Sequence, residues 1–262
     1  MTSPPRDPPV ALVSGASSGI GRALALELCA AGYAVVGIAR RQAPLDEWAA
    51  AVAARGGTAL AEVADCTDPA AVAQAVTTAV RWRGRLDVVV ANAGVYHRGA
   101  ADQLTAAALQ QALEDNLWSA FHLATAVLPH LRARRGQLWF VNSFDAKKGL
   151  PLDSAYVAAK CALAGYAATL RQALRPAGVH VGSVFPGRVD TPMLTELALP
   201  WASPKISAER VARAVRRGIR ARRAEVVVPW WCLPLGWAEV VSPRFADWLV
   251  RRLRLDGHQA GP

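Results

Sequence analysis

A tyrosine and a lysine four residues apart, Tyr156 and Lys160, are the side chains in this sequence best suited to proton transfer. Their spacing places both on one face of a helix. A free tyrosine has a pKa of about 10 and is a poor base at neutral pH. A nearby ammonium favours the phenolate, so we expect Lys160 to lower the pKa of Tyr156. Alone, the same spacing also fits an exposed polar pair on a helix.

A glycine-rich turn near the start of the chain could hold a phosphate. It follows an apolar run at 10–14, precedes a helical pattern, and comprises Gly15, Ser17, Ser18, Gly19, Ile20 and Gly21. Glycines let the backbone approach a pyrophosphate closely, and N–H groups at a helix start face its negative charge. Because dinucleotides bind at the carboxyl ends of such strands, the position favours a dinucleotide site over a tight turn without a ligand.

The spacing of Gly15, Gly19 and Gly21 resembles the short-chain dehydrogenase/reductase family, and further motifs extend the resemblance over about residues 8–230. Asn92-Ala93-Gly94 is similar to a motif of that family. Ser143 stands thirteen residues before Tyr156, in the family's order and spacing, and Asn116 matches its fourth catalytic position.

The resemblance implies a hydride transfer between a nicotinamide and a carbonyl or alcohol carbon, with Tyr156 as the proton donor. It implies that Lys160 binds the nicotinamide ribose, that Ser143 polarises the substrate oxygen, and that Asn116 holds a water in a proton relay. Pro186 and Gly187 resemble the family's segment beside the nicotinamide. Val189 and Thr191 would then contact the carboxamide or the pyrophosphate.

The residues after the second predicted strand favour NADP(H) over NAD(H). An acidic side chain usually binds the ribose of NAD at this position, but Ala39 stands there, followed by Arg40 and Arg41. A guanidinium can bind a 2′-phosphate through charge-assisted hydrogen bonds. The alternative is a solvated basic pair. Asp65 matches the family's adenine-contacting aspartate and is included in the cofactor site with Cys66, although aspartates also serve as turn or cap residues.

Apolar strands alternate with helical patterns along the chain, which predicts a single α/β domain with a Rossmann-like, doubly wound parallel sheet of about seven strands and helices on both faces. Expected strands lie at 10–14, 34–39, 59–64, 86–92, 137–143, 179–185 and 225–228. Expected helices lie at 20–31, 43–55, 69–83, 105–134, 154–174 and 207–222. We expect a disordered lead at 1–8, the catalytic domain at 9–230, and a Trp/Arg-rich extension at 231–262.

Composition narrows the class of protein further. Apolar residues make up 53% of the chain, which excludes a disordered protein. The four cysteines lack the spacing of a zinc site or a disulfide framework, so we expect no metal site and reduced thiols in a cytoplasmic protein. No apolar stretch follows a basic start at the N-terminus, so we expect no signal peptide. The net charge of +10 is spread without a nucleic-acid motif, so we expect a solvated basic surface and no nucleic-acid partner.

The substrate site is expected to include Ser143, Phe144, Asp145 and Tyr156, together with Leu194 and Trp201 in a lid at about 188–206. Phe144 and Asp145 replace the serine-rich run common in the family. The apolar lid suggests an apolar carbonyl or alcohol substrate, although its residues could equally be core. The Trp/Arg-rich extension fits peripheral contact with an anionic membrane, a subunit contact or a cover for the pocket.

The leading hypothesis is an NADP(H)-dependent reductase of hydrophobic ketones, aldehydes or secondary alcohols. The extension and residues 212–229 resemble the hydroxysteroid-dehydrogenase-like branch of the family. One alternative is a ketoreductase of carrier-bound 3-oxoacyl groups, and another is an NADP(H)-binding sensor without turnover. The resemblance implies a homodimer or homotetramer that assembles through the helices at 105–134 and 154–174.

Overall fold

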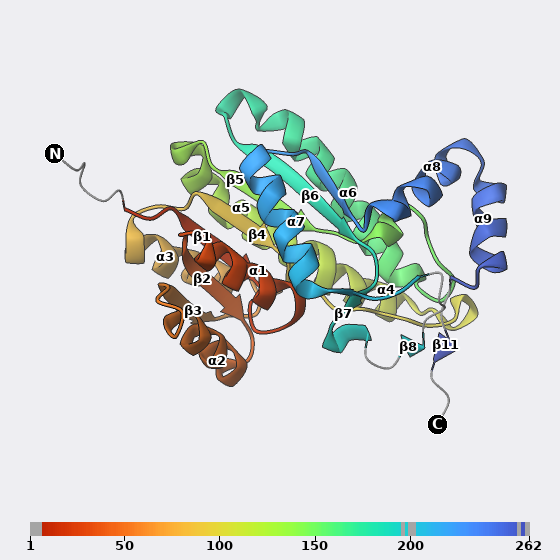
Figure 1. The fold of residues 1–262 in the computed structure, drawn as a ribbon, viewed down its shortest axis with the longest axis horizontal. Helices are drawn as coiled ribbons and strands as arrows, with labels where there is room; N and C mark the ends of the chain where they lie inside the picture. Colours follow the sequence, from red (N-terminus) through yellow and green to blue (C-terminus); the bar gives the residue numbers. More distant parts are fainter. Residues whose placement is uncertain (1–6, 195–196, 199–202, 256–257, 260–262) are drawn as a thin grey trace.

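The computed structural model describes residues 7–194, 197–198, 203–255 and 258–259, with the backbone alone at 194, 197–198 and 258–259. Seven parallel strands form the central sheet in the order β10-β6-β5-β4-β1-β2-β3 (Figure 1). The strands are β1 (Val10–Ser14), β2 (Ala34–Ala39), β3 (Ala59–Val63), β4 (Val88–Ala91), β5 (Gln137–Val141), β6 (His180–Pro186) and β10 (Glu225–Val228). The predicted doubly wound fold is confirmed.

Helices cover both faces of this sheet because its central strands are apolar on both faces. Every residue of β1 and β4 is buried. One face packs against α3 (Pro69–Arg83), α5 (Ser119–Arg134) and α6 (Ser154–Ala173). The other packs against α1 (Gly19–Ala30), α2 (Gln42–Ala53) and α7 (Ala208–Ala221). The order in which strands are added to the sheet reverses between β1 and β4, because β2 and β3 lie on one side of β1 and β4 lies on the other. Open α/β sheets bind ligands at such a point.

The helix predicted at 105–134 contains an interruption that the sequence pattern did not indicate. Its first part is α4 (Ala106–Leu113), and a π-helical turn, η2 (Glu114–Trp118), joins it to α5. A π turn accommodates one extra residue without ending the helix, and such turns often occur at functional sites. Hydrophobic periodicity continues through it, so the sequence predicted one uninterrupted helix. Asn116 lies in this turn.

The segment after β6 and the end of the chain extend the sheet domain at the carboxyl ends of its strands. β7 (Val189–Asp190) pairs with β9 (Ile206–Ser207), and β8 (Leu197–Ala198) pairs with β11 (His258–Gln259). α8 (Leu233–Val241) and α9 (Pro243–Arg252) form a helical hairpin at one end of the molecule (Figure 1). Short 3-10 turns complete the description: η1 (Ala101–Gln103), η3 (Phe144–Ala146), η4 (Arg175–Ala177), η5 (Pro192–Leu194) and η6 (Trp230–Cys232).

Candidate active site

A cavity of about 550 Å³ lies where the carboxyl ends of the strands meet the helical hairpin. The chain segments that follow β1, β4, β5 and β6 all border it, as expected for an open α/β sheet. Most of the predicted site residues line it together: Gly15, Ser18, Gly19, Ile20, Asn92, Ala93, Gly94, Asn116, Ser143, Phe144, Asp145, Tyr156, Lys160, Pro186, Gly187, Val189 and Thr191. The sequence motifs, which are far apart in the chain, therefore converge on one site.

The glycine turn brings backbone atoms too close together for larger residues. Gly15 has a φ of +70°, and a Cβ there would lie 2.7 Å from Asn92 Nδ2. A Cβ on Gly21 would lie 2.2 Å from the Gly15 carbonyl oxygen. Ser18 precedes α1 without making a side-chain cap, so it leaves the first N–H groups of the helix available to an anion. Thr191 lies against this turn, since a Cβ on Gly19 would lie 3.1 Å from its Cγ2.

Asn92 ties the first strand to the fourth beneath this turn. Its Nδ2 donates to the Ser14 carbonyl oxygen at 2.9 Å, and its backbone N–H donates to Ser14 Oγ at 3.0 Å. The Ala93 N–H also donates to Ser14 Oγ, at 3.0 Å. The Asn92 side chain and the Ser14 hydroxyl therefore both link β1 to the segment that follows β4.

Tyr156 and Lys160 are both buried on α6 and face the cavity, with 8% and 4% of their surface exposed. Lys160 Nζ lies 5.5 Å from the centre of the Tyr156 ring and donates to the Val141 carbonyl oxygen at 3.2 Å. Burial lowers the pKa of Lys160 to about 8. A lysine in this state can shed or gain a proton near neutral pH.

The expectation that Lys160 lowers the pKa of Tyr156 is wrong for this structure. Burial and then the charge of Asp145 raise the pKa of Tyr156 above its usual value, although a hydrogen bond with Ser143 acts in the opposite direction. The sequence indicated the lysine but not the depth of burial or the nearby carboxylate. Tyr156 is therefore a neutral phenol across the neutral pH range and is suited to donate a proton.

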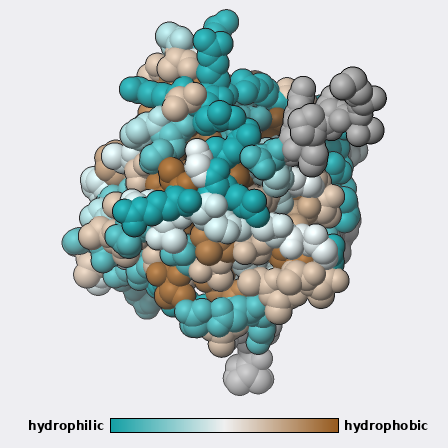
Figure 2. All heavy atoms as spheres, turned by 90° about the vertical axis from the view of Figure 1, so that its left-hand side faces the viewer, coloured by the Kyte–Doolittle hydropathy of each residue, from teal (hydrophilic) through white to brown (hydrophobic). Residues whose placement is uncertain are grey.

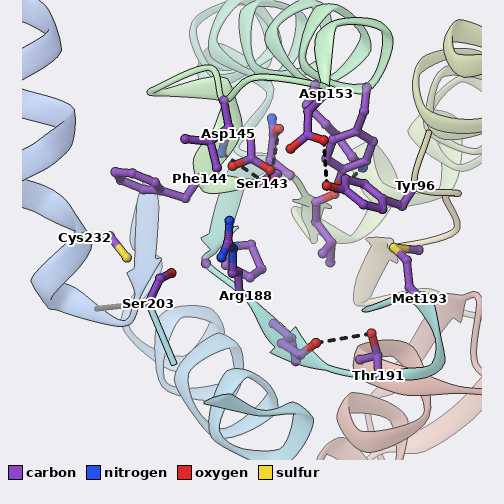
Figure 3. Close-up of a pocket in the computed structure, with 18 of the residues that line it drawn as sticks. Tyr96, Ser143, Phe144, Asp145, Asp153, Arg188, Thr191, Met193, Ser203 and Cys232 are labelled. Carbon is purple, nitrogen blue, oxygen red and sulfur yellow. Dashed lines mark hydrogen bonds between the residues drawn. The ribbon is translucent and has the colours of Figure 1, made fainter. Parts of the chain in front are cut away.

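Ser143 is held by the residue two positions after it. The Ser143 hydroxyl donates to Asp145 Oδ2 at 2.9 Å, and the Asp145 N–H donates to Ser143 Oγ at 3.2 Å (Figure 3). Burial raises the pKa of Asp145 despite this hydrogen bond and the positive charge of Arg188. Asp145 thus positions the Ser143 hydroxyl at the edge of the cavity.

Asn116 uses its amide to fix the loop that follows β4. Its Nδ2 donates to the carbonyl oxygens of Val95 at 2.8 Å and Ala112 at 3.0 Å, and its Oδ1 accepts from the Val95 N–H at 3.3 Å. A Cβ on Gly94 would lie 2.6 Å from Asn116 Oδ1 and 3.5 Å from Lys160 Nζ, so both side chains lie against Gly94. The water-holding role of Asn116 stays a prediction.

Tyr96 and Asp153 also line the cavity, and sequence reasoning missed both of them. The Tyr96 hydroxyl donates to Asp153 Oδ1 at 2.7 Å (Figure 3). The Tyr96 ring packs edge-on against Tyr156 with 5.0 Å between ring centres. Burial raises the pKa of Asp153 to about 6. Asp153 stands three residues before Tyr156, so it projects near the same helix face. That spacing was the available signal.

Six predicted cofactor residues are not among the described residues that line the cavity: Ser17, Gly21, Arg40, Arg41, Asp65 and Cys66. Arg40 and Arg41 are exposed at the end of β2. Asp65 Oδ1 accepts from the Thr67 N–H at 3.0 Å and the Thr67 hydroxyl at 2.9 Å, which is the turn role considered above. Cys66 is buried, and burial raises the pKa of its thiol to about 12. Arg40 is close enough to act on that thiol electrostatically, so it lies near the Asp65–Cys66 segment.

The helical hairpin forms the apolar wall of the cavity, a role that the sequence left open. Its lining residues, with those on either side, are Trp231, Cys232, Pro234, Leu235, Ala238, Phe245, Leu249, Leu253 and Leu255. Phe144 extends toward α8, where a Cβ on Gly236 would lie 3.5 Å from its ring (Figure 3). Within the predicted lid, Trp201 lies outside the described residues, and only the backbone of Leu194 is described, in η5.

A buried lysine attaches the hairpin to the loop that carries Ser143. Lys148 Nζ lies 2.6 Å from Glu239 Oε2 on α8 and 2.6 Å from Asp247 Oδ1 on α9. Only 5% of the Lys148 side chain is exposed. These two carboxylates raise the pKa of Lys148 and outweigh the effect of its burial. One side chain therefore fixes both helices of the hairpin beside the candidate catalytic serine.

Comparison with known proteins places the chain in a family. The family model for short chain dehydrogenases matches residues 9–200, so the chain belongs to the short-chain dehydrogenase/reductase family. It is an oxidoreductase of the kind that acts on CH–OH groups with a nicotinamide cofactor.

Several relatives with different names match most of the chain. An uncharacterized oxidoreductase of Myxococcus xanthus is 34% identical over 93% of this chain and 97% of its own length. A monensin polyketide synthase putative ketoacyl reductase of Streptomyces virginiae is 37% identical over 74% of this chain and 76% of its own. An 11-beta-hydroxysteroid dehydrogenase-like 3 protein of Arabidopsis thaliana is 31% identical over 91% and 79%.

A solved structure has the same fold. The alcohol dehydrogenase from the archaeon Thermococcus sibiricus, complexed with 5-hydroxy-NADP, is 25% identical and has a TM-score of 0.77. The similarity covers 84% of this chain and 95% of that one.

Proposed function

We propose that this protein is an NADP(H)-dependent oxidoreductase that transfers a hydride between the nicotinamide and a carbonyl or secondary-alcohol carbon of a hydrophobic substrate. The observation that carries the proposal is the meeting of Tyr156, Lys160 and Ser143 in one cavity with the glycine turn. The apolar wall formed by the helical hairpin supports a hydrophobic substrate. In this reaction Tyr156 is the general acid in reduction, and its phenolate, formed when the phenol passes its proton toward Lys160, is the general base in oxidation.

The residues of the glycine turn fit a dinucleotide. Gly15 and Gly21 leave room that a Cβ would fill, and the uncapped start of α1 can bind a pyrophosphate. When bound, the nicotinamide supplies or accepts the hydride. Lys160, which lies against Gly94 and close to the Tyr156 ring, would bind the ribose. Val189 and Thr191 would contact the carboxamide or the pyrophosphate.

The proton chemistry of reduction follows from the states of the buried side chains. Negative charge develops on the substrate oxygen as the hydride arrives, and the neutral Tyr156 hydroxyl donates a proton to it. Ser143 turns its hydroxyl hydrogen from Asp145 to the same oxygen, while the Asp145 N–H continues to hold Ser143 Oγ. Lys160, with its pKa near neutrality, then returns a proton toward Tyr156.

A panel of carbonyl compounds and secondary alcohols, followed by NADPH absorbance, tests this function. Tyr156→Phe should lower kcat by about 10²- to 10⁴-fold, the usual contribution of a general acid, and leave NADPH binding largely intact. A fully active Tyr156→Phe variant would overturn the mechanism. NADPH binding without turnover of any compound would favour the non-catalytic sensor.

Carrier-bound 3-oxoacyl groups are a second candidate substrate, and the ketoacyl reductase among the relatives supports it. The basic surface, with a net charge of +10, could bind an acidic carrier protein. Comparing kcat/KM for a 3-oxoacyl carrier conjugate with that for the matching free ketone separates the two candidates. A strong preference for the conjugate would replace the leading proposal.

The choice of NADP(H) depends on Arg40, with Arg41 in support. Arg40 is exposed near the Asp65–Cys66 segment, where the adenosine ribose would lie. Arg40→Ala should weaken NADPH binding by at least about tenfold and NADH binding much less, because only NADPH carries the 2′-phosphate. Equal weakening of the two cofactors would remove Arg40 from the phosphate site.

We also propose that the outer face of the helical hairpin contacts an anionic membrane surface. The side chains of Trp237, Val240, Val241 and Trp248, none of which lines the cavity, are 69%, 84%, 85% and 51% exposed. Arg244, Arg251 and Arg252 are exposed on the same hairpin. On the opposite end of the molecule, hydrophilic side chains are interspersed among apolar ones (Figure 2). Apolar and arginine side chains together suit the interface of an anionic bilayer.

Vesicle sedimentation tests this contact. The protein should sediment with vesicles containing phosphatidylglycerol and less with pure phosphatidylcholine. Trp237→Ser combined with Val241→Ser should weaken the binding several-fold, whereas Val63→Ser, at an exposed apolar residue at the end of β3, should not. Equal behaviour of the two variants would exclude this face. None of the described helices is long and apolar enough to span a bilayer, and a cytoplasmic location stays a prediction.

Assembly through α5 and α6 is a further proposal. Trp118 and Phe121 are 42% and 36% exposed and pack edge-on with 5.4 Å between ring centres. Phe121 also packs against Tyr166 of α6, at 5.7 Å. A second copy of the chain would cover these aromatic rings. Light scattering should give the mass of a dimer or tetramer, and Phe121→Arg should reduce it; a monomeric wild-type protein would contradict the proposal.

A further inference from the structure

Arg188, the first residue of the predicted lid, lies inside the cavity rather than over it. It follows Gly187 at the end of β6 and lines the cavity with Ser143 and Asp145. Its side chain points toward that pair (Figure 3). Its neighbours Gly187 and Val189 belong to the predicted cofactor site, whereas Arg188 does not.

The guanidinium of Arg188 uses only part of its hydrogen-bonding capacity within the described structure. Its Nη2 donates to the Leu255 carbonyl oxygen at the end of the chain, which fixes the direction of the side chain. Its Nη1 is buried and has no hydrogen-bond partner among the described residues. A buried charged donor without an acceptor is costly, so Nη1 is suited to receive an acceptor from a ligand.

The nearby carboxylates already have other partners. Asp145 accepts from Ser143, and Asp153 accepts from Tyr96. Both act on Arg188 through their charge, and no ion pair joins either of them to Arg188 in the described structure. Arg98 adds a second positive charge to this polar corner of the cavity. The corner is therefore close to neutral in charge but retains one buried donor.

We propose that Arg188 Nη1 binds an acceptor oxygen of the substrate other than the oxygen that Tyr156 protonates. The substrate would then carry a second oxygen function, a carbonyl or a carboxylate, near the reacting carbon. Its apolar part would lie against the hairpin side chains Leu235, Phe245 and Leu249. This inference rests on the proposed function, because Tyr156 and Ser143 define where the reacting carbonyl lies.

Three ketones with one carbon skeleton test the proposal: one that carries a carboxylate, its methyl ester, and the ketone without the second oxygen function. The wild-type protein should prefer one or both oxygenated ketones by about tenfold or more in kcat/KM, the effect of one hydrogen bond from a charged donor. Arg188→Met should abolish this preference, and Arg188→Lys should restore part of it. Preference for the acid alone identifies a carboxylate, whereas equal preference for acid and ester identifies a carbonyl oxygen.

Binding of the same three ketones, measured by tryptophan fluorescence, keeps the test independent of turnover, since Trp231 lines the cavity. The exposed Arg55→Met is the matched control and should retain the preference. Equal binding and turnover of all three ketones by the wild type, or an equal loss on all three in Arg188→Met, would overturn the role of Arg188. Failure of the proposed function would differ, because the binding preference would remain while no ketone is reduced.

Discussion

At the nucleotide end of the cleft, backbone atoms approach so closely that glycine is required, whereas at the substrate end the wall consists of side chains from helices near the end of the chain. A Cβ on Gly21 would meet the Gly15 carbonyl oxygen, but α8 and α9 are attached chiefly through Lys148 and apolar contacts. The nucleotide end is set by backbone conformation over a few consecutive residues. The substrate end depends on contacts between segments that are far apart in the sequence, so it can change without altering the fold.

The largest effect is expected where the backbone is most crowded. Gly21→Ala should raise the Kd for NADPH by more than about tenfold and lower Tm, because overpacking of this kind costs about 1–3 kcal/mol. Gly99→Ala is the control, since its Cβ would meet no atom within 4 Å, and its Tm should stay near that of the wild type. Fluorescence titration and thermal unfolding measure both quantities. If Gly21→Ala and Gly99→Ala had the same Kd for NADPH and the same Tm, backbone crowding would not be what sets the nucleotide end of the cavity.

A smaller effect is expected at the attachment of the hairpin. Lys148→Met removes two ion pairs made by a buried ammonium, and we expect a fall in Tm of about 5 °C together with a higher substrate KM. NADPH affinity should change little, because the hairpin borders the substrate end. The neighbouring Lys147→Met is the control: its ion pair with Glu225 is partly exposed and should contribute little. A larger loss in the control would contradict the attachment role.

The smallest effect is expected from Asp153 and depends on pH. Burial raises the pKa of Asp153 to about 6, above its unfolded value, so the folded state binds more protons and wild-type stability falls as the pH rises through about 4 to 6. Asp153→Asn removes this cost and still accepts from Tyr96. Part of the gain is offset because Arg98 and Arg188 lose a nearby negative charge. We therefore expect a net gain of about 1 kcal/mol, roughly 3 °C in Tm, above pH 7.

The same variant should have almost the wild-type Tm near pH 3, where the carboxyl group is largely protonated in both states. Thermal unfolding across this pH range measures the difference directly. A constant difference at every pH would mean that the ionisation of Asp153 has no part in it, and a loss of stability above pH 7 would contradict the sign.

Sequence patterns predicted the sheet well because alternating apolar runs and helical periodicity are local properties. All seven predicted strands occur in the central sheet. The boundaries of some were predicted too long: the strand expected at 86–92 is β4 (Val88–Ala91), since the turn carrying Asn92 and Gly94 belongs to the cavity and not to the strand. The π turn at Asn116 was missed because one extra residue does not interrupt the apolar pattern.

The sequence predicted only those residues of the candidate site that belong to a recognisable motif. Ser143, Tyr156 and Lys160 were predicted from spacing, but Tyr96, Asp153 and Arg188 were not, since their contribution arises from contacts with distant segments. Tyr96 meets Asp153 across more than fifty residues of chain, and Arg188 reaches the Leu255 carbonyl oxygen from a more distant position. Neither contact has a local signature.

The sequence by itself determined the order of strands and helices, the glycine turn and the types of the reacting groups, because each depends on neighbouring residues. Only the tertiary structure decided that Tyr156 is a neutral phenol, that Asp145 holds Ser143, and that the end of the chain forms the apolar wall. The physical reason is burial: the pKa of a side chain and the hydrogen bonds it lacks depend on which distant segments exclude water from it.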